Sequence, residues 1–399
     1  MRSRTAVLLL GLSFPSAVAA SDSAPSSSSS PPAEAVIAEV PFLTGDEANR
    51  ILINLAPDRY KEFRMIVDTG ATDSVLTPRY AEKLGVIVRR TKDSPYRQAT
   101  RLGRDLQFWV DVSSSDTASK TGWEYGLLGG TFLREYVVEL DFAGRRVRFI
   151  DPERYRVPER AEANDQAVVP IKVVGNRPIV PISIGTHVLQ VLLDTGTSVS
   201  AVFSGAAARQ AEISSTPLPG LGAGTVWGPM QVEFAEADSM RVGSFELTHV
   251  PLLVAPKGWY NMGSSTDSVI GYDVLSQFVV RIDYPHQRLW LQRQPDAEVT
   301  YGGISYALQR RAGLLVYSRL KVLDVWGIFP DAPAARLGIR PGDILEPPPG
   351  EKLKDWESRT LEDIAAGKEI TVSREMNGVR VDVPLPSHAG DANADSLQN

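Results

Sequence analysis

One stretch of this sequence occurs twice, and it constrains the fold more than any other feature. Residues 65–72 read Met-Ile-Val-Asp-Thr-Gly-Ala-Thr, and residues 191–198 read Val-Leu-Leu-Asp-Thr-Gly-Thr-Ser. In each copy an apolar, strand-like run delivers one aspartate, Asp68 or Asp194, into a tight glycine turn. A repeat of this kind indicates two related structural units within one chain.

The repeat extends well beyond the aspartates. The triplet Leu127-Leu128-Gly129 is followed by an apolar run at 137–142, and at one constant offset the triplet Val269-Ile270-Gly271 is followed by a run at 279–284. We expect both triplets to pack beneath the aspartate turns, with the glycines allowing close approach of the backbone.

Together these motifs resemble those of the aspartic peptidases: a strand, Asp-Thr-Gly followed by Ser, Thr or Ala, a flap hairpin, and an apolar-apolar-Gly loop before the last strands. The resemblance covers roughly residues 36–293. The length of each unit and the presence of Ala71 are more similar to a retropepsin half. Two halves in one chain imply a pepsin-like pseudo-dimer, with a mostly β, bilobal fold and a pseudo-twofold axis.

The resemblance implies that Asp68 and Asp194 are the catalytic pair. Hydrolysis of an amide without a metal or a covalent nucleophile needs a water made basic on one side and a carbonyl hydrogen-bonded on the other. Two carboxylates in contact supply both, because like charges at about 3 Å cannot both ionise and the pair keeps one proton. Which aspartate holds that proton stays open at this point, since the titration belongs to the pair.

The neighbours of each aspartate have supporting roles. Gly70 and Gly196 allow a turn that a Cβ would crowd. The resemblance implies that the hydroxyls of Thr69 and Thr195 bond across the pseudo-twofold axis and lock the lobes. The supporting set is Thr69, Gly70, Ala71, Thr195, Gly196 and Thr197.

The fourth position differs between the two motifs. Thr197 can donate a hydrogen bond to an ionised Asp194, whereas Ala71 offers no hydroxyl to Asp68. One missing donor raises the first pKa of the pair. We therefore expect a less acidic optimum than that of a pepsin-like enzyme with a hydroxyl in both lobes.

The composition excludes several classes of function. The 399-residue chain is 43% hydrophobic and 23% charged, which suffices for two or three domains with ordinary cores. Its net charge of -6, without a basic cluster, argues against nucleic-acid binding. Cysteine is absent, so a disulfide, a thiolate metal site and a cysteine nucleophile are all ruled out.

Signatures of metal and nucleotide sites are also missing from the sequence. It contains no His-Glu-x-x-His pair, no Gly-x-Ser-x-Gly elbow and no Gly-Lys-Ser/Thr phosphate loop. The histidines are His187, His249, His286 and His388. We expect no metal and no cofactor, which leaves the paired carboxylates as the candidate chemistry.

The N-terminus is typical of an exported protein. Residues 1–20 contain Arg2 and Arg4, a short apolar run and small residues suited to cleavage, as in a secretory signal peptide. Residues 21–35 are rich in Ser and Pro and predict a disordered leader. We expect a periplasmic or extracellular protein without stable membrane insertion.

Two strand-rich lobes follow. We assign residues 36–155 to the first lobe and 166–293 to the second, because the intervening residues are charged, contain Pro and lack periodicity. Short helices are predicted at 78–84 and 205–211. The second lobe is longer between its aspartate and its glycine triplet, and the additional residues are expected to include the segment 240–245 and a strand at 250–254.

The flap of each lobe is less clearly marked. In the second lobe the glycine-rich segment before 226 predicts a hairpin tip, with candidate flap residues Gly222, Ala223, Gly224 and Thr225. In the first lobe the candidate is residues 96–103. A plain surface loop is an equally good interpretation of the second-lobe segment.

A third unit is predicted at 299–386. The run 331–345 resembles the short helix and following turn of PDZ domains, and the peptide-binding loop would be Gly313, Leu314, Leu315 and Val316. A helix is predicted at 360–366. Strands are predicted at 369–373 and 379–385, joined by the hairpin signal Asn377-Gly378. Residues 387–399 predict a disordered tail.

The sequence thus predicts a bilobal aspartic endopeptidase followed by a small α+β PDZ domain that binds the C-terminal or internal peptides of polypeptide substrates. We expect a monomer. Two alternatives remain at this stage: a non-catalytic adaptor of the cell envelope whose PDZ unit binds peptides, and a retropepsin-like homodimer in which each lobe pairs with its twin in another molecule.

Overall fold

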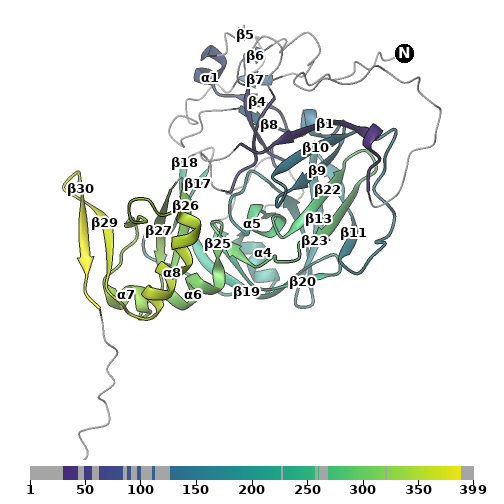
Figure 1. Ribbon diagram of the computed structural model, residues 1–399. Coiled ribbons are helices and arrows are strands. Elements are labelled where there is room, and N and C mark those ends of the chain that lie inside the picture. The colour runs from purple at the N-terminus through teal and green to yellow at the C-terminus, as the bar shows by residue number, and fades with distance from the viewer. Residues whose placement is uncertain are drawn as a thin grey trace, which may run out of the picture.

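The computed structural model describes residues 30–43, 49–55, 63–83, 88–90, 97–99, 110–112, 126–225, 228–256, 259, 268–319 and 321–387. The predicted signal segment, residues 21–29 of the predicted leader and residues 388–399 of the predicted tail lie outside the described residues. Residues 33–35, at the end of the predicted disordered leader, form a short 3-10 helix instead. The described part is mostly β, with short helices between the strands (Figure 1). Among the described residues, none of the helices combines the length and the apolarity needed to span a membrane.

The first half of the chain, residues 36–155, contains strands in short runs. A small helix is present at 78–83, where the sequence predicts one at 78–84. The elements are η1 (Ala33–Ala35), β1 (Val36–Pro41), β2 (Leu52–Asn54), β3 (Arg64–Val67), β4 (Val75–Leu76), α1 (Pro78–Lys83), β5 (Val88–Arg90), β6 (Arg97–Ala99), β7 (Val110–Val112), β8 (Gly126–Leu128), α3 (Gly130–Leu133), β9 (Val137–Asp141) and β10 (Arg146–Ile150).

The second half, residues 166–293, repeats this order with longer strands. The elements are β11 (Gln166–Pro170), β12 (Lys172–Val174), β13 (Arg177–Ile184), β14 (His187–Leu193), β15 (Ala201–Ser204), α4 (Gly205–Gln210), β16 (Ser215–Thr216), β17 (Gly222–Thr225), β18 (Gly228–Gln231), β19 (Glu233–Val242), β20 (Phe245–Ala255), β21 (Val269–Ile270), α5 (Tyr272–Leu275), β22 (Phe278–Asp283) and β23 (Arg288–Arg293). The additional residues of this half form the long hairpin β19–β20, which turns at Gly243 with φ of 60°. Its second strand begins at Phe245, earlier than the predicted strand at 250–254.

A six-stranded sheet joins the two halves. Its strand order is β1-β10-β9-β22-β23-β11, so each half contributes three strands. At the centre β9 runs antiparallel to β22, and the register is symmetric about the pair Glu139 and Arg281. Each half also has a sheet of its own, with orders β2-β3-β8-β4-β7-β6-β5 and β12-β13-β14-β21-β15-β20-β19-β16.

Charged residues lie buried at the centre of the joining sheet. Glu139 and Arg281 are 1% and 6% exposed, and the Arg281 guanidinium donates to the Glu139 carboxylate. Arg148 also donates to Glu139, at 2.7 Å, and the Arg281 guanidinium lies 4.0 Å from the centre of the Trp290 ring. These contacts satisfy the charges, since an isolated ion in such a position would be costly.

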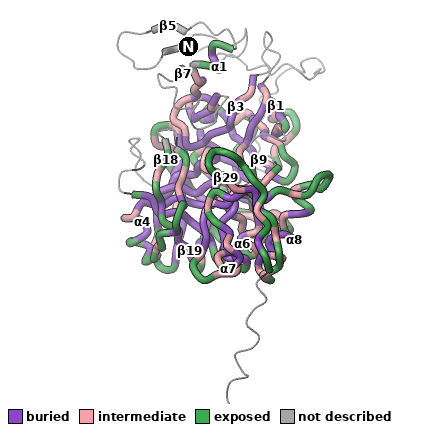
Figure 2. The backbone as a smooth tube through the Cα atoms, turned by 90° about the vertical axis from the view of Figure 1, so that its left-hand side faces the viewer, coloured by how far each residue is buried: buried purple, intermediate pink, exposed green. Residues whose placement is uncertain are grey.

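The connection between the halves packs against this sheet. Tyr155 and Val157 are fully buried in a cluster with Trp290, and the Val157 N–H donates to Asp283 Oδ2 at 3.0 Å. Arg288 holds the same segment through the Val157 carbonyl at 3.0 Å. Figure 2 shows buried backbone through the middle of the molecule and exposed turns around it.

The C-terminal unit, residues 299–386, has one sheet of its own. Its elements are β24 (Thr300–Tyr301), β25 (Ile304–Ser305), α6 (Tyr306–Ala312), β26 (Leu314–Arg319), β27 (Val322–Ile328), α7 (Pro333–Leu337), β28 (Ile344–Leu345), α8 (Leu353–Ala365), β29 (Ile370–Met376) and β30 (Val379–Leu385). The sheet order is β26-β27-β28-β29-β30, and β24 pairs with β25 in a separate hairpin. The turn between β29 and β30 has positive φ at Asn377 and Gly378, as an Asn-Gly hairpin requires.

Two helices of this unit differ from the sequence-based expectation. Helix α8 begins at Leu353, before the predicted start at Thr360, because its buried stripe begins at Trp356 and continues at helical spacing to Ile364. Helix α6 was not predicted, although Gly313 caps it with φ of 78° and basic residues occupy its last turn.

The C-terminal unit packs against the second half. Phe329 makes an edge contact with Phe234, with 5.1 Å between the ring centres, and the Tyr306 hydroxyl donates to Glu236 Oε2 at 2.6 Å. Leu315 of β26 joins Leu221 in one buried cluster. The base of the β17–β18 hairpin therefore lies against the C-terminal sheet (Figure 1).

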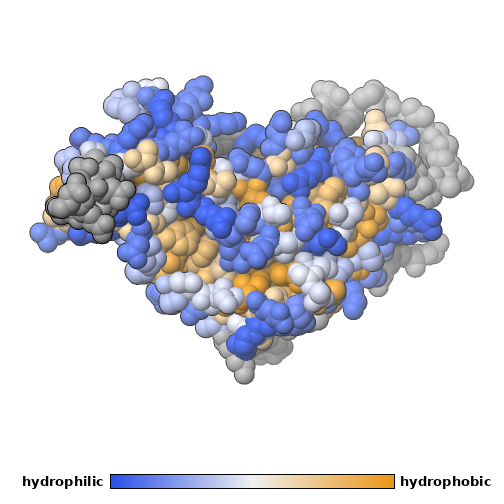
Figure 3. Space-filling view, turned by 90° about the horizontal axis from the view of Figure 1, so that it is seen from below, coloured by the Kyte–Doolittle hydropathy of each residue, from blue (hydrophilic) through white to orange (hydrophobic). Residues whose placement is uncertain are grey.

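The hairpin β29–β30 exposes large hydrophobic side chains. Seen from below, the molecule is mostly hydrophilic, with hydrophobic patches between polar residues (Figure 3). Among the described residues, the large hydrophobic side chains that are exposed are Val188, Met376, Val379 and Val381. Three of these belong to β29–β30, whose outer strand is an edge of the sheet.

We predict that Arg281→Met lowers the free energy of unfolding by about 3 kcal/mol, because the buried Glu139 carboxylate loses its partner on β22. The matched control is Glu135→Gln, in an exposed pair with Arg134, for which a change below about 1 kcal/mol is expected. Urea denaturation measures both. Equal effects of the two variants would contradict the assignment of Arg281 to the joining sheet's core.

Candidate active site

Asp68 and Asp194 occupy equivalent places at the ends of two strands. Asp68 follows β3, which pairs in parallel with β8, and the Asp68 N–H donates to the Leu128 carbonyl at 3.0 Å. Asp194 follows β14, which pairs in parallel with β21, and its N–H donates to the Ile270 carbonyl at 3.0 Å. In both cases the apolar strands fix the backbone that presents the carboxylate.

The two carboxyl groups are in contact. A Cβ placed on Gly70 would lie 2.4 Å from Asp194 Cγ, and one placed on Gly196 would lie 2.7 Å from Asp68 Cγ. Each carboxyl group thus lies against the glycine of the other turn, where any larger residue would displace it. The carboxyl groups are hydrogen-bonded to each other, and both side chains are buried.

The threonines of the two turns bond reciprocally. Thr69 Oγ1 donates to the Leu193 carbonyl at 2.7 Å and accepts from the Thr195 N–H at 3.0 Å. Thr195 Oγ1 donates to the Val67 carbonyl at 2.6 Å and accepts from the Thr69 N–H at 3.1 Å. Both side chains are fully buried, so these four bonds join the turns in a site without competing water.

The donors that reach each carboxylate differ. Asp68 Oδ1 accepts from the N–H groups of Gly70 and Ala71, each at 2.9 Å. Asp194 Oδ1 accepts from the Gly196 N–H at 2.8 Å, and Oδ2 accepts from the Thr197 hydroxyl at 2.8 Å. Only the second aspartate of the pair therefore has a hydroxyl donor on its own turn.

These differences separate the two carboxyl groups electrostatically. Burial, the charge of Asp194 and the hydrogen bond to it raise the pKa of Asp68 well above its usual range. Burial also raises the pKa of Asp194, but the Thr197 hydroxyl and the Gly196 N–H lower it again. The pKa of both carboxyl groups is therefore raised, and the Thr197 hydroxyl favours the ionised form of Asp194.

The apolar-glycine triplets lie directly beneath the turns. Leu128, Val269 and Ile270 are fully buried, whereas Leu127 is half-buried. A Cβ on Gly129 would lie 2.2 Å from the Asp73 carbonyl oxygen, and one on Gly271 would lie 2.2 Å from that of Val199. Glycine is therefore required at both positions for the triplets to support the turns.

Three residues near the turns were not anticipated from the sequence. Asn49 Nδ2 donates to the Ser198 carbonyl at 3.0 Å and to Asp273 Oδ1 at 2.9 Å. Asn176 Nδ2 donates to the Thr72 carbonyl at 3.3 Å. A sequence signal for the asparagines exists, because each is followed by Arg and then by an apolar strand, in the same place in each half.

The candidate flap residues of the second half lie in a β-hairpin. Residues 222–225 form β17, which pairs with β18 from Gly222↔Gln231 to Thr225↔Gly228. In the first half, part of the candidate segment 96–103 forms β6, which pairs with β5 and β7, and its remaining residues lie outside the described part.

The residues expected to form a peptide-binding loop lie at the end of a helix and in a strand. Gly313 caps α6, and Leu314, Leu315 and Val316 are fully buried in β26. The Val316 N–H donates to Gln309 Oε1 at 2.8 Å, and the Ser318 N–H donates to the Gly302 carbonyl at 3.1 Å. Gln309 and Gly302 of the same chain thus already accept from the two β26 amides that an added peptide strand would use.

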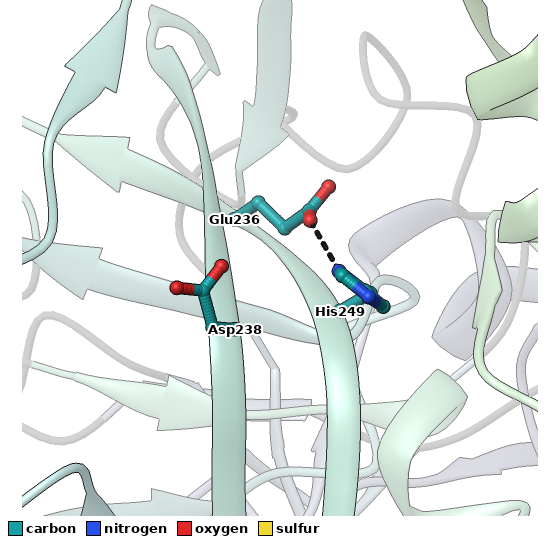
Figure 4. A group of neighbouring side chains, drawn as sticks. All are labelled: Glu236, Asp238 and His249. Atoms are coloured by element: carbon teal, nitrogen blue, oxygen red, sulfur yellow. Dashed lines mark hydrogen bonds and ion pairs between the residues drawn. The ribbon is translucent and has the colours of Figure 1, made fainter.

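A second group of polar side chains contains the residue types that commonly bind metal ions. Glu236, Asp238 and His249 bring ligand atoms within 4.8 Å of one another on β19 and β20 (Figure 4). Arg310 lies 3.4 Å from Glu236 Oε2 and 3.3 Å from His249 Nδ1. Because this guanidinium already provides the positive charge, we interpret the group as an ion-pair anchor for α6.

A family model described as aspartyl protease matches residues 180–274, which include Asp194 and the triplet at 269–271. A comparison with curated proteins finds no match. Among solved structures, a retropepsin-like aspartic protease from Rickettsia conorii is 16% identical, and the alignment covers 32% of this chain and 90% of that one with a TM-score of 0.24. The family match supports an aspartic protease.

We predict that Thr197→Val moves the acid limb of the kcat/KM profile to higher pH. Loss of the hydroxyl donor raises the pKa of Asp194, and activity is lost as pH falls through that pKa because the ionised form is required. Ala71→Ser should move the alkaline limb to lower pH, because an added donor lowers the pKa of Asp68.

The matched control for these profiles is Thr216→Val, at an exposed position of β16. Its profile should coincide with that of the wild type. If neither Thr197→Val nor Ala71→Ser moves its limb of the kcat/KM profile, the assignment of the acid limb to Asp194 and the alkaline limb to Asp68 is wrong.

Proposed function

We propose that this protein is an exported, bilobal aspartic endopeptidase in which Asp68 and Asp194 form one composite site about a pseudo-twofold axis. The observation that carries the proposal is the contact between these two buried carboxyl groups at the ends of equivalent strands. The symmetric register of β9 and β22 and the reciprocal threonine bonds support the pseudo-twofold relation.

The proposed chemistry assigns a different task to each aspartate. Asp194, the ionised member, takes a proton from the water that attacks the peptide carbonyl. Asp68, the protonated member, donates a hydrogen bond and then its proton to the carbonyl oxygen. As the C–N bond breaks, Asp194 gives this proton to the leaving amine and Asp68 takes one back from a hydroxyl of the tetrahedral intermediate, so the pair returns to its single-proton state.

The substrate would lie extended across the carboxyl groups beneath the β17–β18 hairpin. Polypeptides are therefore the proposed substrates, without metal or cofactor. The C-terminal unit is proposed to be a PDZ-like domain, supported by its sheet with helices α7 and α8, and to bind peptide termini or tether substrates once the segment that covers β26 moves aside. Export to the periplasm or the outside of the cell rests on the signal-like residues 1–20.

A monomer is proposed because the two turns complete each other within one chain. Thr69 bonds to Leu193 and Thr195 bonds to Val67, so neither half needs a twin from another molecule. The homodimer alternative predicts activity that falls on dilution. Cleavage per mole of enzyme that stays constant down to nanomolar concentration would exclude that alternative.

We predict that Asp68→Asn and Asp194→Asn each lower kcat for a random peptide library at least about 10³-fold, because either change removes the acid or the base. The double variant should be no worse than the single ones, since the pair acts as a unit. Pepstatin should inhibit the wild type.

Asp296→Asn, at an exposed position, serves as the control and should retain full activity. Cleavage at wild-type rate by either aspartate variant would refute the composite site. If the wild type shows no cleavage but the protein still binds peptides, the adaptor alternative gains support.

A further inference from the structure

Each aspartate turn is held by an asparagine from the other half of the chain. Asn49, from the first half, donates to the Ser198 carbonyl of the second turn at 3.0 Å. Asn176, from the second half, donates to the Thr72 carbonyl of the first turn at 3.3 Å. Thr72 and Ser198 occupy the same position in the two turns, so the arrangement is reciprocal.

The backbone at both asparagines is left-handed. Asn49 has φ of 56° and Asn176 has φ of 65°. Among residues with a side chain, Asn adopts this conformation with least strain. The same unusual backbone at two equivalent positions indicates a shared task, which is to point the side-chain amide across the boundary between the halves.

The carbonyls of Thr72 and Ser198, which accept from the two asparagines, directly follow residues that donate hydrogen bonds to the catalytic aspartates. In the first turn, Ala71 donates its N–H to Asp68 and accepts the Gly130 N–H at 2.8 Å. In the second turn, Thr197 donates its hydroxyl to Asp194 and accepts the Tyr272 N–H at 2.8 Å. A hydrogen bond to the Thr72 or Ser198 carbonyl therefore restrains the preceding residue, which is Ala71 or Thr197.

The two asparagines are anchored differently. Asn176 Oδ1 accepts from the exposed Arg134 guanidinium at 2.7 Å. Asn49 instead donates to Asp273, which is 1% exposed. The Asp273 carboxylate also accepts the Thr300 hydroxyl at 2.8 Å and the N–H groups of Gly302 and Gly303 at 2.8 and 3.1 Å.

The β24–β25 hairpin can reach Asp273 only through glycines. A Cβ on Gly303 would lie 2.5 Å from Asn49 Oδ1, and one on Gly302 would lie 2.7 Å from the Val316 carbonyl oxygen. The Thr300 carbonyl accepts the Ser200 hydroxyl at 2.9 Å, which is a second link to the segment after the turn. The first hairpin of the C-terminal unit thus belongs to the hydrogen-bond network that supports the second turn.

We propose that Asn49 and Asn176 are positioning residues for the two catalytic carboxyl groups, and that Asp273 fastens the Asn49 contact to the C-terminal unit. This inference rests on the proposed peptidase function. Asn49 maintains the Thr197 hydroxyl on Asp194, and Asn176 maintains the Ala71 N–H on Asp68. Neither asparagine touches the reacting atoms, so each acts through its turn.

The test compares Asn49→Gly with Asn176→Gly in the full chain. Glycine accepts positive φ at both positions, so the substitution removes the amide without adding backbone strain. We expect kcat to fall about tenfold in each variant with KM changed less than twofold, because small displacements of catalytic groups affect the chemical step. The substrate is a peptide identified from the random library.

The pH profiles distinguish the two positions. Asn49→Gly should move the acid limb of kcat/KM to higher pH, since a displaced Thr197 hydroxyl raises the pKa of Asp194. Asn176→Gly should move the alkaline limb to higher pH, since a displaced Ala71 N–H raises the pKa of Asp68. In a Thr197→Val background, Asn49→Gly should shift the acid limb no further.

Thr300→Val tests the attachment of the C-terminal unit. It removes one donor from Asp273 and should reproduce part of the effect of Asn49→Gly on kcat and on the acid limb. Ser305→Ala, which removes a bond to Glu298 on the same hairpin, is the control and should leave both unchanged. If Asn49→Gly does not fold, Thr300→Val carries the test of this half of the inference.

The outcomes separate this inference from the proposed function. A wild type that cleaves no peptide overturns the proposed function itself. An active wild type whose asparagine variants keep the same kcat and the same limbs overturns the positioning role. Reduced activity in proportion to a smaller folded fraction, with unmoved limbs, also overturns it, because that pattern indicates a structural role alone.

Discussion

The structure depends on two carboxyl groups that are buried against each other. Bringing two aspartates into contact within a site of low dielectric constant is costly when both are ionised, and retention of one proton relieves this repulsion. The proton alone does not suffice, because the remaining negative charge still needs donors. The backbone N–H groups of both turns and the Thr197 hydroxyl supply them. The Asp-Thr-Gly turn is thus a means of presenting N–H groups to a largely buried charge.

The two halves repeat the backbone but not the polar chemistry. Where the first turn has Ala71, the second has Thr197, and where the helix after the first triplet has Thr131, the helix after the second has Asp273. In the second half Thr197 donates to Asp194, and Asp273 accepts from Asn49, which also donates to the second turn. This asymmetry favours ionisation of Asp194, because the Thr197 hydroxyl donates to the charged form of that carboxyl group.

The sequence predicts that the two aspartates pair, because two strands that end in the same motif are expected to occupy equivalent places in the two halves. It also predicted the glycines beneath the turns and the Asn377-Gly378 hairpin, since these positions depend on local backbone geometry. The sequence does not predict the contacts of Asn49 and Asn176. These contacts require a left-handed backbone and a partner in the other half, and neither produces a periodic pattern of apolar residues.

The same limit applies to the C-terminal unit. Gly313 has the residue type of a loop, and local pattern alone does not distinguish a helix cap from a peptide-binding turn. In the folded unit Gly313 caps α6, and the Gln309 amide oxygen accepts the Val316 N–H. Helix α8 was predicted too short because Trp356 belongs to its buried stripe, and the pattern N-terminal to Thr360 contains charged residues that obscure it.

The position of Gly302 bears on what the C-terminal unit is able to do. Its N–H donates to Asp273 beneath the second turn, and its carbonyl accepts from Ser318 on the edge strand β26. A peptide strand that adds to β26 needs the Ser318 and Val316 amides, so it has to displace Gly302 and Gln309 first. Displacement of Gly302 then removes a donor from a buried carboxylate whose next contact is Asn49. A peptide bound at this edge and the support of the second turn would therefore compete for one residue, Gly302.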